Sequence, residues 1–333
     1  MKNCYFTSRR TSLSMMVGTA VALCGAFLCT PAAAQAYPSK PIRVIVAAGT
    51  GTVGDMVARL LAVHMSKSMG QNIVVDNIPA AGGVTGTLQL VRASKDGYTL
   101  AVLSNNHVIN PSVYKDMPFD SIKDIGPITT LGSTPLVLVT NPNVPAKDLR
   151  ALLALSKAKP GLLTYGSAGN GTVLHLAGVL LTSEGKVDIK HVPYKASGQM
   201  VTDAMSGQID MVFLGVASGA AMIEAGKLQA IGVTTTKRSQ IMPNVPTLAE
   251  QGLSNYNFDG WLALAGPAGL PRPIVDKLNA EVKAAFGLKE VQETLAKMAV
   301  TTTHSTPEAA AQFFQSELDK HSQLAKRGGA TLD

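Results

Sequence analysis

Short runs of β-branched residues alternate with helix-length segments along most of this chain, and this alternation limits its possible folds more than any other feature. Residues Ile42–Val46 are predicted to form a buried strand. Residues Asp55–Ser68 are predicted to form a helix with one apolar face that ends at Gly70. Strands separated by helices usually pair in parallel, because each helix returns the chain to the start of the next strand. The pattern therefore predicts an α/β protein with a mainly parallel sheet.

A second series of strands and helices begins after Asn141–Pro145, where two prolines interrupt the first series. Single cores stop growing at about 250–300 residues, so a chain of 333 residues favours two lobes. We expect residues 37–138 and 258–333 to form the first lobe and residues 139–257 the second, with the chain crossing between the lobes more than once. Further strands are predicted at Ile73–Asp76, Thr99–Leu103, Leu162–Tyr165, Ile189–Tyr194, Ile209–Leu214 and Leu228–Thr234, and further helices at Thr172–Thr182, Gly198–Met205, Ser218–Glu224, Pro273–Phe286 and Pro307–Leu324.

The first 36 residues have the pattern of a secretory signal peptide. A basic start is followed by an apolar core, Met15–Leu28, and by the small residues Ala32–Ala36, which predicts cleavage after Ala34 or Ala36. The pair Arg9–Arg10 suggests twin-arginine export, but the aromatic residue expected after the pair is missing, so ordinary export is favoured. The apolar core is shorter than the roughly 20 residues of a membrane span. We expect a periplasmic protein without direct membrane insertion.

Charge and composition exclude several classes of function. Removing residues 1–36 takes away three basic and no acidic residues, so the formal net charge falls from +7 to +4. This small surplus, without a basic cluster, argues against a nucleic-acid partner. The cysteines Cys4, Cys24 and Cys29 all lie in the predicted signal peptide, which leaves no thiol nucleophile. Metal-ligand spacings and a G-x-S-x-G motif are also absent from the sequence, so we expect neither an enzyme nor a metal or cofactor site.

One motif points to a different function. Gly49–Gly54 matches the G-x-G-x-x-G pattern between a predicted strand and helix, and Asp76 follows about 20 residues later, as in dinucleotide-binding proteins. This alternative is an exported NAD-dependent oxidoreductase. It is disfavoured because an exported protein meets little nicotinamide cofactor and because no acid/base pair for hydride transfer follows. A glycine-rich turn at a helix N-terminus can equally bind another anion.

A second glycine-rich turn, Ser167–Thr172, also leads from a predicted strand into a helix. Free amide groups and the helix dipole at such a turn suit a carboxylate. Two such turns, one in each predicted lobe, suggest a ligand held from both sides. His107 and His191 lie near strand ends and could reach such a ligand, whereas His175 is equally consistent with packing. The predicted ligand-binding residues are Thr50, Gly51, Thr52, Ser167, Asn170, Gly171 and Thr172, with Ser104 and Asn105 as secondary candidates.

Motifs along nearly the whole predicted mature chain resemble one family. The segments that carry the resemblance are Tyr37–Arg43, Asp55–Ala62, Asp96–Leu100, Asn110–Tyr114, Gly169–Thr172, His191–Lys195, Ala225–Leu228 and Asn244–Thr247. They resemble the Bug-type receptors, the periplasmic solute-binding components of tripartite tricarboxylate transporters. The resemblance implies a two-lobe, type II-like Venus-flytrap fold that closes on a small carboxylate held partly through backbone amides and ordered water. It also implies delivery to membrane permease subunits, without covalent chemistry. We expect the receptor to be a monomer.

Two departures from the family pattern bear on the ligand. The loop before Asp55 lacks the usual prolines, and its polar pair is replaced by Val53–Gly54, so the dinucleotide match is interpreted as accidental. Leu214 and Gly215 are also predicted to be ligand-binding residues. They stand where these receptors often carry an Asp or Asn pair, which in amino-acid binders can pair with the ligand ammonium. Since an unpaired buried ammonium is costly, amino acids are predicted to bind poorly. The expected ligand is an aliphatic or aromatic mono- or dicarboxylate. A receptor that reports to a membrane sensor kinase is an alternative role.

Overall fold

The computed structural model describes residues 37–195 and 197–330. The described residues from Lys40 onward form one compact unit. The predicted signal peptide, with its three cysteines, lies outside the described residues. Among the residues that are described, no helix is long and apolar enough to cross a membrane.

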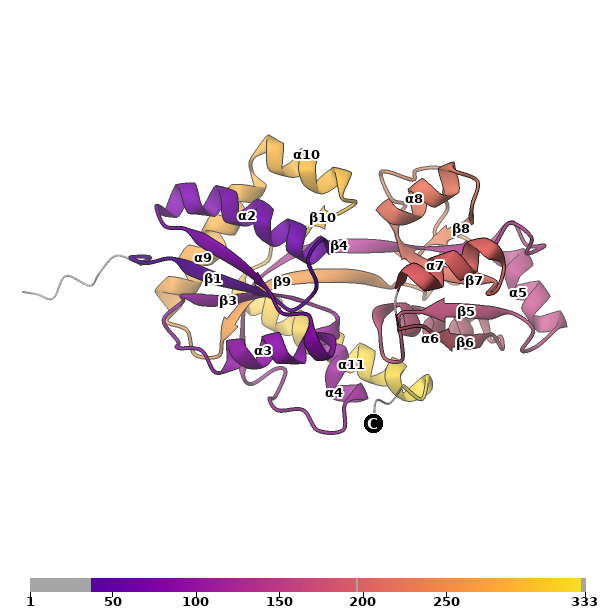
Figure 1. Ribbon diagram of the computed structural model, residues 1–333, viewed down its shortest axis with the longest axis horizontal. Coiled ribbons are helices and arrows are strands. Elements are labelled where there is room, and N and C mark those ends of the chain that lie inside the picture. The colour runs from indigo at the N-terminus through magenta and orange to yellow at the C-terminus, as the bar shows by residue number, and fades with distance from the viewer. Residues whose placement is uncertain (1–36, 196, 331–333) are drawn as a thin grey trace, which may run out of the picture. The chain divides into compact units, whose positions relative to one another are not determined.

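The first group of strands is parallel, as the sequence predicts. Strand β1 (Ile42–Val46) lies between β2 (Ile73–Asn77) and β3 (Thr99–Ser104), and both neighbours run in its direction. Helix α2 (Val53–Met69) connects β1 to β2 and packs against both strands (Figure 1). A short 3-10 turn, Ala80–Gly83, and helix α3, Val84–Val91, follow β2.

The second group of strands repeats this arrangement. Strand β5 (Thr164–Ser167) lies between β6 (Lys190–Pro193) and β7 (Met211–Gly215), again in parallel. The predicted elements of this region are confirmed, with their ends shifted by a few residues. The helices of this group are α5 (Leu149–Ala158), α6 (Val173–Gly185), α7 (Ser197–Ser206) and α8 (Val216–Glu224).

Two central strands join the groups and make the sheet mixed. Strand β4 (Ile125–Thr140) pairs antiparallel with β9 (Asp259–Pro267), and β9 in turn pairs antiparallel with β3. Beyond Pro135, the same strand β4 pairs antiparallel with β7 and with β8 (Gln229–Val233). One continuous strand therefore belongs to both groups, as Figure 1 shows. The lobe boundaries near residues 138 and 258 remain a prediction.

The C-terminal helix α11 (Pro307–Arg327) also links the two strand groups. It packs against α4 (Asn106–Val113), against β4 and, near its end, against α6. Leu324 and Ala325 at its end are buried in the same apolar core as the side chains of β5 and α6. The remaining elements of the first group are α9 (Arg272–Phe286), α10 (Lys289–Lys297) and β10 (Thr301–Thr302).

Candidate functional site

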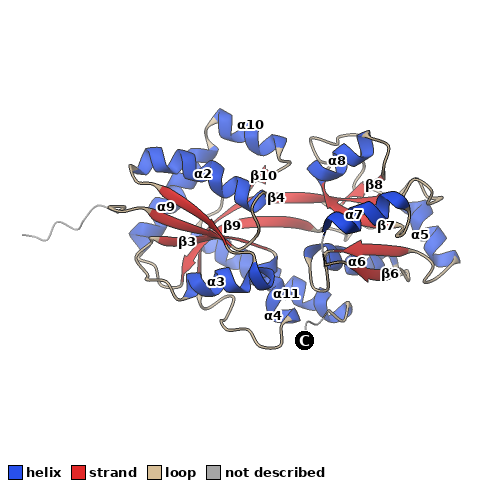
Figure 2. Ribbon diagram, viewed as in Figure 1, coloured by secondary structure: helices blue, strands red, loops and turns tan. Residues whose placement is uncertain are grey.

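All of the predicted ligand-binding residues lie at, or just after, the carboxyl ends of parallel strands. Some of them follow the last residue of β1, β3 or β5, and the others are the last residues of β3, β5 and β7. In open α/β sheets these ends are where ligands bind, because the connecting loops there present helix N-termini. The arrows of β5 and β6 point toward the strand group that holds β1 and β3 (Figure 2).

The turn after β1, which we call the first turn, is closed by hydrogen bonds among its own residues. Thr52 is the N-cap of α2. Its hydroxyl donates to the Gly49 carbonyl at 2.8 Å and accepts from the Asp55 amide at 3.4 Å. The Gly51 amide donates to Oδ2 of Asp55 at 2.9 Å. Gly51 has φ +80°, a left-handed conformation in which glycine is unstrained.

The turn after β5, which we call the second turn, has the same bonds. Thr172 caps α6. Its hydroxyl donates to the Gly169 carbonyl at 2.8 Å and accepts from the His175 amide at 3.3 Å. The Gly171 amide, at φ +71°, donates to Nδ1 of His175 at 3.0 Å. The backbone angles of the two capping threonines agree within a few degrees.

The two turns therefore form one repeated motif. Gly49–Asp55 and Gly169–His175 share the pattern G-x-G-T-V-x-x. Sequence analysis paired the two turns as anion-binding loops but did not use this short repeat, which shows that the turns are equivalent residue by residue. At each turn the first amides of the helix find no acceptor within that helix. These amides belong to Val53 and Gly54 in the first turn and to Val173 and Leu174 in the second. Together with the helix dipole, these amides create a local preference for anions.

The first turn is supported by a charged cluster. Arg59 donates through Nε to Oδ1 of Asp55 at 2.9 Å and through Nη2 to Asn77 at 2.8 Å. Asn77 in turn donates to the carbonyl of Ala48 at 3.2 Å. Burial alone would raise the pKa of Asp55, but the Gly51 amide and the Arg59 guanidinium outweigh it and hold the pKa below its usual value. The Asp55 acceptor is therefore a fixed negative charge at neutral pH.

The second turn is supported by stacked aromatic rings. His175 and His191 lie nearly parallel, with ring centroids 4.0 Å apart, and Tyr165 stacks against both, at 5.0 Å from His191 and 6.5 Å from His175. Nε2 of His191 lies 2.6 Å from the hydroxyl of Ser167, which also accepts the Gly169 amide at 3.1 Å. The buried Ser167 side chain is thus bonded within the turn. Burial lowers the pKa of both histidines to about 4, and for His191 the nearby His175 contributes as well.

The other predicted residues have different surroundings. Asn105 is buried. Its amide nitrogen donates to the Asp259 carbonyl at 3.0 Å, and its oxygen accepts the Trp261 amide at 2.8 Å, so the side chain anchors the start of β9. Ser104 is the last residue of β3. Leu214 is buried in an apolar core, and Gly215 beside it is exposed.

The second turn also touches the first strand group. A Cβ atom on Gly171 would lie 2.3 Å from Cγ1 of Val113, the last residue of α4. Helix α4 follows β3, so the glycine lets a turn of the second group pack tightly against a helix of the first. Gly82, near the same helix, lies close to the side chains of Asn110 and Tyr114. Sequence analysis did not single out α4 as a neighbour of the second turn.

The residues of the dinucleotide motif have structural partners. Asp76 on β2 accepts from Arg43 on β1, and the guanidinium of Arg43 also bonds Gln89. Gly54 is buried, and a Cβ atom placed there would touch Leu262 and Val102. The position that would bind a ribose is therefore occupied by an ion pair between neighbouring strands.

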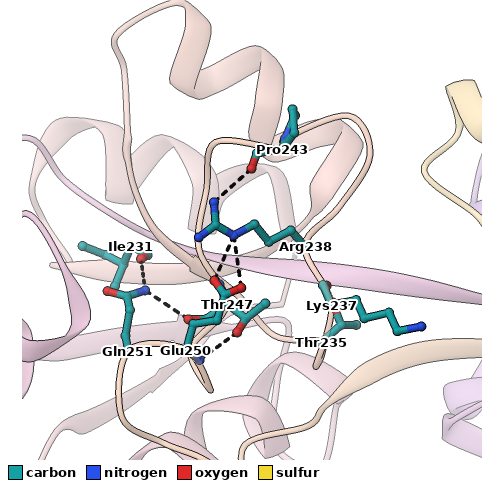
Figure 3. Close-up of polar contacts among 8 residues, drawn as sticks. All are labelled: Ile231, Thr235, Lys237, Arg238, Pro243, Thr247, Glu250 and Gln251. Carbon is teal, nitrogen blue, oxygen red and sulfur yellow. Dashed lines mark hydrogen bonds and ion pairs between the residues drawn. The ribbon is translucent and has the colours of Figure 1, made fainter.

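The segment after β8, which contains the Asn244–Thr247 motif, is held by its own polar contacts (Figure 3). Thr247 and Glu250 form reciprocal bonds: the Glu250 amide donates to the Thr247 hydroxyl at 2.8 Å, and the Thr247 amide donates to the Glu250 carboxylate at 2.9 Å. Arg238 pairs with the same carboxylate at 2.9 Å and bonds the Pro243 carbonyl at 3.2 Å. Lys237 points away from this cluster. The Asn244–Thr247 motif is thus part of a loop whose conformation is stabilised by these contacts.

Comparison with known proteins identifies the family. The model of the tripartite tricarboxylate transporter family receptor matches residues 57–329. The chain is 36% identical to a protein encoded in the tcbD-tcbE intergenic region of Pseudomonas sp. strain P51, over 87% of each chain. It is 32% identical to Protein BugT of Bordetella pertussis, over 97% of this chain and 99% of BugT.

Solved structures agree with this assignment. Rpa4515 of R. palustris, solved with adipate, has a TM-score of 0.79 and 28% identity, and the match covers 89% of this chain and all of that one. MatC from Rhodopseudomonas palustris, solved with bound malate, has a TM-score of 0.74 and 28% identity, over 87% and 100% of the two chains. The predicted two-lobe periplasmic binding protein fold is confirmed, and these relatives are solute-binding receptors, not enzymes. This chain belongs to the receptors of the tripartite tricarboxylate transporter family.

Proposed function

We propose that this chain captures one small organic carboxylate between its two lobes and delivers it to the membrane subunits of a tripartite tricarboxylate-type permease. The repeated turn carries the proposal. Two helices begin with the same capped geometry, one in each strand group, and each offers amides without an acceptor in their own helix. A ligand that touches both lobes favours the closed state through the contacts it gains there.

The ligand class follows from the surroundings of the turns and from the relatives. Adipate and malate, found in two related structures, are both dicarboxylates. A dicarboxylate can place one anionic group at each turn, and apolar residues such as Val53 and Leu214 lie near the same strand ends. We therefore expect an aliphatic or aromatic carboxylate, and a dicarboxylate in particular. Amino acids should bind poorly, because the residue pair Leu214–Gly215 offers no carboxylate for an ammonium group.

A thermal-shift screen of residues 37–333 tests this proposal. The panel contains adipate, malate, a tricarboxylate, an aromatic carboxylate, glutamate and NAD. A ligand present at about 100 times its dissociation constant adds about 2.7 kcal/mol of stability, which shifts Tm by several degrees. We expect shifts with carboxylates and none with glutamate or NAD. A shift with NAD alone would overturn the proposal.

Delivery needs a separate test. Membrane vesicles that contain the permease subunits should take up the ligand only when this receptor is added. If the loaded receptor instead activates a membrane sensor kinase and supports no uptake, the alternative sensory role is correct.

A further inference from the structure

The two turns are alike except for the side chain that holds the second glycine amide. In the first turn this acceptor is a carboxylate, Asp55 Oδ2, at 2.9 Å from the Gly51 nitrogen. In the second turn it is an imidazole, His175 Nδ1, at 3.0 Å from the Gly171 nitrogen. Both acceptors stand four residues after the glycine and in the first turn of their helix. The same task is thus performed by a permanent anion in one lobe and by a neutral ring in the other.

The His175 ring is fixed in place by its neighbours. It stacks on His191 at a centroid distance of 4.0 Å with an interplanar angle of 18°. His191 reaches the start of the same turn through Ser167, whose hydroxyl lies 2.6 Å from Nε2. Ser167 accepts the Gly169 amide. The stacked pair therefore holds the turn at two points, through the amides of Gly169 and Gly171.

The charges around His175 favour its neutral form. The titratable or charged groups that face it are Tyr165 from β5, His191 from β6 and Arg327 from the end of α11, which line a pocket of ≈ 430 Å³ together with His175. No carboxylate belongs to the described residues that line this pocket. Burial lowers the pKa of His175 to about 4, so at neutral pH Nδ1 keeps the lone pair that accepts from Gly171.

We propose that His175 is the positioning residue of the second turn: by accepting the Gly171 amide it sets the ligand-facing amides of α6, as Asp55 does for α2. This proposal rests on the proposed function of the turns. The two turns should therefore respond differently to acid. A protonated Nδ1 can no longer accept a hydrogen bond, so acid removes the acceptor of the second turn while the ionised Asp55 still holds the first.

The first test uses the full chain without ligand. The NMR chemical shifts of the Gly51 and Gly171 amides are followed from pH 7.5 to the acid limit of folding. The Gly171 amide should titrate together with His175, whereas the Gly51 amide should not move in the same range. In His175→Asn, whose side-chain oxygen can accept but does not titrate, the Gly171 shift should become independent of pH. A Gly171 amide that is insensitive to His175 protonation contradicts the proposal.

The second test measures affinity at pH 7.5 for adipate and malate. His175→Ala leaves the Gly171 amide without its acceptor and should weaken binding about tenfold. His175→Asn should recover most of that loss, since it restores an acceptor without restoring the stacked ring. His64→Ala, which removes a histidine from α2 near Glu290, is the control and should bind as the wild type does. Equal losses in the Ala and Asn variants would mean that His175 only packs.

The two tests separate this inference from the function on which it rests. If neither adipate nor malate binds but Gly171 still titrates with His175, the expectation of an aliphatic dicarboxylate is wrong and the positioning role stands. If a carboxylate binds and His175→Ala binds it as tightly as the wild type, the function stands and the positioning role is wrong.

Discussion

The indole N–H of Trp261 donates to Oε2 of Glu317 at 2.9 Å, and both side chains are buried. Trp261 lies in β9 and Glu317 in α11, so this bond ties a central strand to the helix that links the two strand groups. Glu317 also contacts His321 and Lys320, each at 3.2 Å. Burial would raise the pKa of Glu317, but its bond with His321 and the charge of Lys320 prevail and keep the pKa lowered.

Removing this acceptor should destabilise the protein. Glu317→Ala leaves the Trp261 N–H buried without a partner, which costs about 1–3 kcal/mol of unfolding free energy. Glu317→Gln keeps a side-chain oxygen at the same place and should lose less than the Ala variant. Urea unfolding monitored by the fluorescence of Trp261, the single tryptophan of the sequence, measures both. Equal losses in the two variants would show that the bond to Trp261 does not matter.

The glycine of the first turn should matter for binding, and a matched glycine elsewhere should not. Gly51 and Gly226 both have positive φ and open space where a Cβ would stand. Alanine at either site should cost about 1 kcal/mol of stability, because the left-handed conformation is unfavourable for it. Calorimetric titration with adipate should show weaker binding only for Gly51→Ala. Comparable weakening in Gly226→Ala would mean that general destabilisation, and not the first turn, lowers affinity.

Stability should fall in acid because of a buried histidine. His107 donates through Nε2 to the Ser121 carbonyl at 2.7 Å, and burial lowers its pKa from 6.5 to about 4. Between these values the unfolded chain binds the proton more readily, so the unfolding free energy decreases as the pH falls. This loss of stability begins below about pH 6.5 and reaches about 3 kcal/mol once the pH has fallen below 4.

Replacing His107 tests how much of the acid-induced loss of stability comes from this side chain. His107→Gln keeps a donor for Ser121 but does not titrate. The variant should be less stable than the wild type at pH 7.5 and should lose less stability on acidification. His175, His191 and the carboxylates with lowered pKa values, such as Asp55 and Glu317, contribute to the pH dependence that remains. Parallel pH profiles for the two proteins would exclude His107 as a source.

The acid of the apparent dinucleotide motif should be dispensable for ligand binding. Asp76 pairs with Arg43, and both side chains are about 40% exposed, so the pair contributes at most about 1 kcal/mol to stability. Asp76→Asn should therefore bind adipate with wild-type affinity and should bind no NAD. A large loss of carboxylate affinity in this variant would place the ligand next to β2.

Most of the strands and helices could be predicted from the sequence because their periodicity is local. Strand β1 is predicted with its observed bounds, and α2 is predicted to within two residues at its start. Strand β4 was not predicted, because Pro127, Pro135 and two glycines interrupt its pattern. Strand β4 is held in the sheet by pairing with β9 and β7, and both of these strands lie far away in the sequence. Helix α4 was missed for a similar reason, since it contains Pro111.

The candidate site could be predicted in part. The two glycine-rich turns are local in sequence, and the structure gives them one geometry. The partners of Asn105 on β9 and α11 are more than 150 residues away, so no local pattern shows that its side chain is already bonded. The approach of Val113 to Gly171 and the stacking of His191 on His175 also arise only in the folded chain.

The central claim is that one carboxylate is held by both turns, and calorimetric titration of a dicarboxylate into the wild type and into the double variant Gly51→Ala, Gly171→Ala tests it most directly. The account predicts one ligand per wild-type chain and no measurable binding to the double variant, with circular dichroism confirming that the variant is folded. A folded double variant that binds adipate or malate as tightly as the wild type would contradict the claim.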